Sequence, residues 1–239
     1  MSAVLELDHV SRVYGSGAAA VKALDDVSLT VDDGAFVAVM GASGSGKSTL
    51  LGIAGGLDQA TSGTVSMLGE PLAGRSRDDL ARLRRESLGF VFQDFNLVPT
   101  LTAVENIALP LELDGVNAKQ ARVQALAALE RVGLPELADR FIEQMSGGQR
   151  QRIAIARAIV GERRLVLADE PTGALDSHTG DGIMALLRQL ADEGIAVILV
   201  THEARHAGWA DRVVFLCDGS IIDESRRLGD PSELLTGRR

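Results

Sequence analysis

The chain has 239 residues, 46% of them hydrophobic, and a formal net charge of −9 at pH 7. This length suits one large domain, or a core with an inserted subdomain, and the apolar content is ample for a buried core. The negative charge makes the chain a poor electrostatic partner for nucleic acid, so no nucleic-acid partner is expected.

Near the N-terminus, two stretches alternate apolar and polar residues, as half-buried strands do. They are residues 4–10 and 24–31, and a turn signal at residues 32–34 follows the second. We expect these strands to pair antiparallel. Residues 1–8 lack a basic region followed by an apolar stretch, so no signal peptide is expected there.

A phosphate-binding loop is indicated at residues 41–49, which read Gly-Ala-Ser-Gly-Ser-Gly-Lys-Ser-Thr and match the pattern G-x-x-x-x-G-K-S/T. The motif requires a strand before it and a helix after it, and residues 35–40 and 50–54 have those patterns. Its glycines permit backbone conformations that side chains forbid, so successive N–H groups form an anion nest beside a helix N-terminus. Lys47 would reach the β- and γ-phosphates of a nucleotide, and the Ser48 hydroxyl would bind Mg²⁺. The residues expected to bind nucleotide here are Gly41, Ser43, Gly44, Ser45, Gly46, Lys47, Ser48 and Thr49.

Short elements follow the loop and its helix. Residues 61–65 indicate a turn and a strand, residues 78–85 a short charged helix, and residues 87–92 a strand that Gln93 follows directly. From about residue 94 to residue 161 the hydrophobic period becomes helical. We interpret this segment, 94–161, as a helical insertion into a phosphate-binding core.

Two helices are predicted within the insertion. The first begins at Asn117, a plausible N-cap, and stops at Gly133. Its apolar residues at helical spacing are Val123, Leu126, Ala127 and Val132. The second runs over residues 146–160 and stops before Gly161.

The core resumes with the fully apolar run 165–168, which ends in Asp169 and Glu170. Such a run is typical of a parallel strand buried on both faces, and its carboxyl end would lie at the crevice where open α/β sheets bind ligands. Asp169 would hold Mg²⁺, directly or through water, and Glu170 would orient the attacking water; the alternative is an acidic cap for the next helix. A second buried strand, 195–200, leads to His202, which is either a γ-phosphate contact or a structural histidine.

The remaining elements are a helix at residues 180–190, weakened at its start by Gly182, a closing hairpin, and a short helix at residues 230–235. The hairpin strands are residues 213–217 and 220–223. Cys217, the single cysteine, excludes an intrachain disulfide, fits a reducing compartment and is interpreted as a small buried hydrophobe. The apolar runs fall far short of the ~20 residues that span a bilayer, so any membrane role should come through a partner.

A second anion site is indicated where Ser146, Gly147 and Gly148 open the second insertion helix. An ordinary serine N-cap would account for Ser146, but not for two adjacent glycines that weaken the first helical turn.

These motifs, in this order and at these separations, resemble those of the ATP-binding-cassette (ABC) transporter ATPases. They are the phosphate loop 41–48, Gln93, residues 145–149, Asp169-Glu170, residues 174–176 and His202. The resemblance covers nearly the whole chain, from Val4 to about Glu224. Two mild departures are Met145, where leucine is commoner, and Glu203, where aspartate is commoner; neither removes a catalytic group.

The resemblance implies the fold class α/β: a P-loop NTPase (RecA-like) core with an N-terminal antiparallel β subdomain and an inserted α-helical subdomain. Residues 1–239 would form a single ABC ATPase domain, with residues 1–93 and 162–239 as the nucleotide-binding core and residues 94–161 as the helical subdomain.

The resemblance also implies roles for residues in a head-to-tail homodimer that holds two ATP molecules with Mg²⁺. Tyr14 would stack on adenine, although a packed or edge aromatic is the alternative, and Asp176 would couple the two sites across the interface. The residues that would bind ATP in trans are Ser146, Gly147, Gly148 and Gln149. The catalytic residues would be Glu170, His202, Lys47 and Gln93, and the Mg²⁺ ligands Ser48, Gln93 and Asp169.

Within the family, residues 92–102, 104–111 and 171–176 look like those of macrolide-exporter and lipoprotein-release ATPases. This subgroup implies an integral membrane permease subunit that contacts the helical subdomain and transmits ATP-driven closure mechanically. The chain would then be cytoplasmic and peripheral on the inner face of the plasma membrane.

Several alternatives share the phosphate loop. A non-transport ABC ATPase, either a cell-division hydrolase regulator or a soluble iron–sulfur assembly factor, would carry the same catalytic motifs. A GTPase should carry an Asn/Thr-Lys-x-Asp motif, which is not found, and a small-molecule kinase is the other reading in that class. A chromosome-maintenance ATPase needs a long coiled coil between Ser48 and Met145, and that segment has no heptad pattern.

Overall fold

A four-stranded antiparallel sheet forms one end of the molecule in the computed structural model, which describes residues 3–226. Its strand order is β2-β1-β4-β5. The strands are β1 (Ala3–Tyr14), β2 (Val21–Asp32), β4 (Ser62–Met67) and β5 (Glu70–Pro71). The predicted antiparallel pairing of the two N-terminal strands is confirmed, although both strands are longer than predicted.

The second sheet has six strands in the order β10-β9-β3-β8-β7-β6, and all neighbours pair in parallel except β9 with β10. Its strands are β3 (Phe36–Met40), β6 (Leu88–Phe92), β7 (Leu165–Asp169), β8 (Ala196–Thr201), β9 (Arg212–Cys217) and β10 (Ser220–Arg226). In register, Met40 lies opposite Thr201 and Asp169 opposite Val200. The carboxyl ends of β3, β7 and β8 therefore meet at one edge of the sheet, the edge at which such sheets bind ligands.

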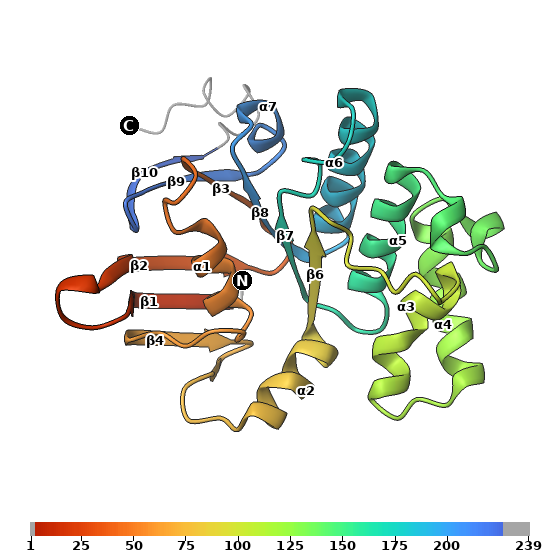
Figure 1. Ribbon diagram of the computed structural model, residues 1–239, viewed down its shortest axis with the longest axis horizontal. Helices are drawn as coiled ribbons and strands as arrows, with labels where there is room; N and C mark the ends of the chain where they lie inside the picture. The colour runs from red at the N-terminus through yellow and green to blue at the C-terminus, as the bar shows by residue number, and fades with distance from the viewer. Residues whose placement is uncertain (1–2, 227–239) are drawn as a thin grey trace, which may run out of the picture.

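The helices divide between the core and an insertion. The core helices are α1 (Lys47–Ala54), α2 (Arg77–Ser87), α6 (Ser177–Asp192) and α7 (Ala204–Ala207). The inserted helices are α3 (Ala103–Leu113), α4 (Ala118–Arg131) and α5 (Gly147–Ile159), and 3-10 turns lie at Gly17–Ala19, Pro135–Leu137 and Ile142–Gln144. Figure 1 shows the antiparallel strands at one end of the molecule and α3, α4 and α5 at the other, with the six-stranded sheet between them.

Two apolar clusters hold these layers together. One joins the six-stranded sheet to the inserted helices and α6, and the other packs α1 between the two sheets. Leu50 and Ile53 of α1, for example, are buried against the same cluster as Leu5 and Leu7 of β1. Among residues 3–226, no helix combines the length and the apolar character that crossing a bilayer requires.

The helical insertion is confirmed, but its packing differs from the prediction. Helix α3 was not predicted, and Val123 and Ala127 of α4 are exposed rather than buried. The buried face of α4 is made by Ala121, Ala125, Ala128 and Leu129. Small residues let helices approach closely, so this face depends on alanines that a search for large apolar residues overlooks. The predicted caps hold: the Asn117 side chain accepts a hydrogen bond from the Gln120 N–H at 3.0 Å, and Gly133 has φ 73°.

Three further predictions concern the C-terminal third. Gly182 does not delay α6, which begins at Ser177 behind its N-cap Asp176. Cys217 is exposed, not buried, because neighbouring side chains alternate between the faces of a strand and Leu216 takes the inward position. The helix predicted at residues 230–235 lies outside the described residues.

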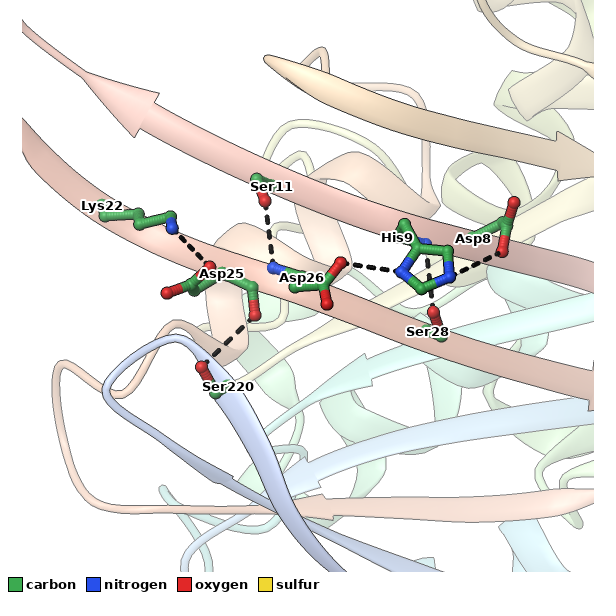
Figure 2. Close-up of polar contacts among 8 residues, drawn as sticks. All are labelled: Asp8, His9, Ser11, Lys22, Asp25, Asp26, Ser28 and Ser220. Carbon is green, nitrogen blue, oxygen red and sulfur yellow. Dashed lines mark hydrogen bonds and ion pairs between the residues drawn. The ribbon is translucent and has the colours of Figure 1, made fainter.

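A bulge with two strained residues interrupts the pairing of β1 with β2. His9 and Asp26 have φ values of 50° and 55°, which non-glycine residues rarely adopt. Figure 2 shows their side chains meeting, with His9 Nδ1 at 2.8 Å from Asp26 Oδ1. The His9 N–H donates to Ser28 Oγ, and the Asp26 N–H donates to Ser11 Oγ.

The bulge also connects β2 to the hairpin turn between β9 and β10. The Asp25 N–H donates to the Gly219 carbonyl at 2.8 Å. Figure 2 shows the second contact, in which Ser220 Oγ donates to the Asp25 carbonyl. The Gly219 N–H in turn donates to the carbonyl of Ser45 in the phosphate loop at 3.0 Å. The strained bulge thus lies two backbone hydrogen bonds away from that loop.

We expect the His9–Asp26 pair to make stability depend on pH. The Asp26 carboxylate, through its hydrogen bond and charge, and then Asp8 raise the pKa of His9. Because the pKa of His9 is raised in the folded state, the pair stabilises the fold fully at pH values below ~6.5, the ordinary histidine pKa. This stabilisation is lost as the pH rises through the higher pKa of the folded state. NMR titration should therefore give His9 a pKa above ~6.5 that Asp26→Asn lowers. The control variant Asp25→Asn should leave the pKa of His9 unchanged. If His9 titrates identically in the wild type and in Asp26→Asn, the pairing of His9 with Asp26 is contradicted.

Candidate functional site

A cleft of 810 Å³ opens at the carboxyl ends of β3, β7 and β8. It brings together nine of the predicted site residues from three separate segments. These are Ser43, Gly44, Gly46, Lys47, Ser48, Thr49, Asp169, Glu170 and His202. Residues 21–23 of β2 and the turn Asp218-Gly219 complete its lining. No sequence motif predicted that these two segments line the cleft. They reach it only because β2 and the β9–β10 hairpin pack against the phosphate loop in the folded chain.

The phosphate loop requires glycine at its narrowest points. Gly44 and Gly46 have φ values of 82° and 106°, in the region that favours glycine. A Cβ at Gly46 would come closer than 3.0 Å to the Ala23 carbonyl, and one at Gly41 would meet the Leu216 carbonyl. In the described chain no side chain caps the first turn of α1, so its N–H groups are left for an anion.

Lys47 carries a positive charge that is largely withdrawn from solvent. Its Nζ donates to the carbonyls of Gly41 and Ala42, each at 2.8 Å, and both partners are neutral. Ser45 Oγ is buried beside them and has no hydrogen-bond partner within residues 3–226. A buried ammonium held by neutral groups and an unsatisfied hydroxyl fit a phosphate ligand.

Ser48 and Asp169 meet from opposite sides of the cleft. Ser48 Oγ donates to Asp169 Oδ2 at 3.3 Å. Burial raises the pKa of Asp169, and the hydrogen bond from Ser48 offsets part of this rise. A hydroxyl and a buried carboxylate are hard oxygen ligands, and a divalent cation between them would compensate the cost of burying the charge. The pair fits Mg²⁺.

Glu170 lies next to Asp169 in a strained conformation. Its φ is 45°, and its N–H is held by the Val200 carbonyl at 2.9 Å. Its Oε2 lies 2.8 Å from Nδ1 of His202, which follows β8. Backbone strain of this kind persists only where the surrounding structure fixes the residue. In this conformation the Glu170 carboxylate lies against the imidazole of His202.

Gln93 and Tyr14 do not line the cleft. Gln93 is exposed and lies against the loop after β7, where a Cβ at Gly173 would be 2.9 Å from the Gln93 side-chain carbon. The guanidinium of Arg12 covers one face of the Tyr14 ring at 4.4 Å, and the Tyr14 hydroxyl donates to Asp58 at 2.6 Å. Arg12 and Asp58 also form an ion pair at 2.7 Å. Nothing in the local sequence indicated this cluster, because Asp58 is distant in the chain.

Ser146 and Gln149 form a capping box at the start of α5. The Ser146 side chain accepts from the Gln149 N–H at 3.3 Å, and the Gln149 side chain accepts from the Ser146 N–H at 2.9 Å. These residues belong to the helical subdomain and do not line the cleft of their own chain. Asp176 caps α6 in the same manner, accepting from the N–H groups of His178 and Thr179, and the Thr179 hydrogen bonds lower its pKa.

The two glycines of α5 have a reason within the chain. A Cβ at Gly148 would come closer than 3.0 Å to Cγ2 of Thr179 in α6, and a Cβ at Gly147 would lie 3.2 Å from Leu175. At Gly148, helix α5 therefore approaches α6 so closely that a side chain would force Thr179 to move, whereas at Gly147 the contact is merely tight. This packing explains why the first turn of α5 contains two glycines, although glycine weakens a helix.

Comparison with known proteins agrees with this geometry. A family model described as ABC transporter matches residues 24–173. The macrolide export ATP-binding/permease proteins MacB of Shigella flexneri and of Escherichia coli K12 are each 46% identical over 222 residues. That match covers 93% of this chain but 34% of each relative, so the chain spans about a third of their length.

Solved structures match over nearly the whole chain. A dimeric post-hydrolysis structure of the ATP-binding cassette MJ0796 with ADP and Pi is 41% identical, with a TM-score of 0.85, and covers 95% of this chain and 100% of that one. CbiO1 of Clostridium perfringens, part of an ABC transporter complex, is 28% identical with a TM-score of 0.85 and covers 99% of this chain and 92% of its own. The fold and the site define a P-loop ATPase built as an ATP-binding cassette. The chain belongs to the ABC transporter family.

We predict that Gly148→Ala destabilises the chain through a clash with Thr179. Overpacking of this kind costs about 1–3 kcal/mol in the free energy of unfolding, which outweighs the ~1 kcal/mol by which alanine favours a helix over glycine. Urea unfolding without nucleotide measures this loss. The double variant Gly148→Ala/Thr179→Ser removes the clashing methyl and keeps the hydroxyl that bonds Asp176, so it should recover most of the loss relative to Thr179→Ser alone. No recovery in the double variant would refute the packing explanation.

Proposed function

We propose that the chain is the Mg²⁺-dependent ATP-hydrolysing subunit of a bacterial ABC transporter. In this proposal it dimerises head-to-tail around two ATP molecules and drives a separate membrane subunit of the mechanotransmission type. The observation that carries the proposal is the meeting of Lys47, Ser48, Asp169, Glu170 and His202 in one cleft. The relatives that export macrolides favour export of a macrolide or peptide, or lipoprotein release, over import.

We assign a task to each of these side chains. The nest of the phosphate loop and Lys47 would hold the phosphates, and Ser48 and Asp169 would hold Mg²⁺, which would neutralise charge that develops on the phosphates. Gln93, which lies outside the cleft lining against the loop after β7, would move in to join them as a third ligand. Glu170 would accept a hydrogen bond from the attacking water and orient it. His202, within hydrogen-bond distance of Glu170, would hold both the carboxylate and the γ-phosphate.

The second half of each site would come from a second copy of the chain. The N-terminus of α5, with Ser146 and Gln149, lies on the helical subdomain and offers a capped first turn to an anion. Two dimeric structures of a relative, 41% and 42% identical to this chain, support a second copy of the chain as the partner. Asp176, which begins α6 beside this helix, would couple the two sites, and Tyr14 would stack on adenine with the ring face that Arg12 leaves free.

We place the membrane subunit in a groove of 470 Å³ between α2, α3 and β6. Its apolar lining includes Leu57, Phe90, Leu109 and Leu113. Its charged lining consists of the arginines Arg84, Arg85, Arg157 and Arg163. An amphipathic helix that carries a carboxylate would match this combination of apolar floor and positive rim.

Arg163 gives the groove its preference for an acidic partner. The residue is 6% exposed, its Nε has no hydrogen-bond partner in the described chain, and burial lowers its pKa, although the nearby Asp114 and Glu86 offset part of this. Arg157 is held by the carbonyls of Phe95 and Asn96 rather than by a carboxylate, and burial lowers its pKa too. Burial outweighs the attraction that Asp114 and Glu86 exert on Arg163, and Arg157 is held by neutral carbonyls, so a carboxylate that enters the groove would stabilise both charges. Such a partner would place the chain on the cytoplasmic face of the membrane.

Glu170→Gln should separate ATP binding from hydrolysis. The amide cannot accept a proton from water, so kcat should fall by about 10²-fold or more, while ATP still binds and a dimer accumulates. Size-exclusion chromatography with light scattering at saturating ATP measures the dimer, and Lys47→Ala should form none. Glu130→Gln, an exposed residue of α4, is the control. A Glu170→Gln protein that stays monomeric with ATP would count against the head-to-tail sandwich.

The groove predicts that two exposed apolar residues of the helical subdomain differ in their importance. Leu113 lines the groove and is 66% exposed, whereas Val123 lies outside it and is 63% exposed. Leu113→Ser should weaken co-purification with a membrane partner by about tenfold, and Val123→Ser should not. Basal ATPase activity should be unchanged in both.

The partner is identified by mass spectrometry after mild-detergent purification from membranes. A protein with few membrane helices and a large external domain supports the proposal. Equal loss in both variants, or a soluble partner, contradicts it and favours a non-transport ATPase.

A further inference from the structure

Two side-chain pairs join the same two loops, one of them in the cleft and the other buried outside its lining. Glu170 and Thr172 lie two residues apart in the loop after β7, and His202 and His206 lie four residues apart in the segment after β8. Glu170 contacts His202 at 2.8 Å, and Thr172 Oγ1 contacts His206 Nδ1 at 3.0 Å. The proposed function uses the first pair and assigns nothing to the second.

The second pair is buried. Thr172 is 6% exposed and His206 is 3% exposed. Gly180 of α6 faces both, since a Cβ there would lie 3.5 Å from Thr172 and 3.7 Å from His206. Glu203 approaches the same ring nitrogen at 3.4 Å. Because a buried group that loses its partner stays desolvated and unpaired, this contact strongly favours one arrangement of the two loops.

Each end of the buried pair is tied closely to a residue of the cleft. The Gly173 N–H donates to the Glu170 carbonyl, and the Leu175 N–H donates to the Thr172 carbonyl, both at 3.0 Å. The loop from Glu170 to Leu175 is thus one hydrogen-bonded unit. On the other side, α7 has four residues and no side-chain cap in the described chain, so tertiary contacts must place it and the adjoining His202.

We propose that Thr172 and His206 are positioning residues for hydrolysis, which hold the Glu170 loop and the His202 segment at their working separation. The proposal rests on the roles given above to Glu170 and His202. The phosphate loop makes no part of this contact, so the buried pair controls the hydrolytic step rather than ATP affinity. Neither residue touches nucleotide.

Steady-state kinetics of the whole chain at saturating Mg²⁺ test the proposal. Thr172→Val keeps the shape of the side chain and removes the hydroxyl, and we expect kcat to fall by about tenfold with KM for ATP within about twofold. Thr172→Ser keeps the hydroxyl and should retain kcat within about threefold. His206→Asn, which can present a polar atom where Nδ1 lies, should retain more activity than His206→Leu. Because the pair acts as a unit, Thr172→Val/His206→Leu should be no slower than the slower single variant.

Ile183→Val is the matched control, because it removes a buried methyl from α6 and keeps both polar groups of the Thr172–His206 pair, so it should leave kcat unchanged. Thermal melts confirm that each variant is folded at the assay temperature, and the histidine variants serve if Thr172→Val is not. Wild-type kcat in Thr172→Val, equal loss in the valine and serine variants, additive losses in the double variant, or a rise in KM alone would each overturn the proposal. If Glu170→Gln hydrolyses ATP like wild type, the proposed function itself fails. A slow Glu170→Gln beside a fully active Thr172→Val would reject only the positioning role.

Discussion

The parallel register of β3, β7 and β8 is the constraint on which the rest of the structure depends. Met40 opposite Thr201 and Asp169 opposite Val200 bring the ends of three strands level, although they are far apart in the chain. The phosphate loop, the carboxylates and His202 each follow one of these ends directly. A register shift of one residue would turn every side chain of a strand to the opposite face of the sheet. Because both faces of these strands are buried and closely packed, such a shift would disrupt the packing on both sides. The site is therefore positioned by the hydrophobic core.

Close packing and ligand binding demand glycine at the same places. Gly46 adopts a φ of 106° and also leaves room for the Ala23 carbonyl, and Gly148 leaves room for Thr179. A glycine in a phosphate loop or at a helix N-terminus is usually explained by the ligand alone. Here a side chain added at either position would collide with its neighbour even without nucleotide, so loss of function in a glycine variant needs a stability measurement before it is assigned to binding.

The sequence predicted most of what local patterns determine, and little of what distant contacts determine. The loop that ends β3, the Asp169-Glu170 pair and His202 were placed correctly because each lies at the end of a recognisable apolar strand. The face of α4 was predicted wrongly because alanines make the contact, and α3 was missed. The contacts of Tyr14 with Asp58 and of Thr172 with His206 join segments that no pattern relates. The exposure of Cys217 follows from strand alternation, which a uniformly apolar run conceals.

The helical subdomain is connected to the site through buried polar side chains of α5. Gln151 is fully buried and donates to the carbonyls of Phe92 and Pro171, which flank Gln93 and Glu170. Arg157, which follows Gln151 in the C-terminal half of α5, donates to the carbonyls of Phe95 and Asn96. Because Gln151 is fully buried and its bond to the Pro171 carbonyl is buried too, breaking that contact would leave polar atoms unpaired, so rotation of α5 should carry the Gln93 segment and the loop of Glu170 with it. The same helix carries Ser146 at its N-terminus and lies beside the arginine-lined groove, so one rigid element connects the proposed partner ATP, the hydrolytic loop and the proposed membrane contact.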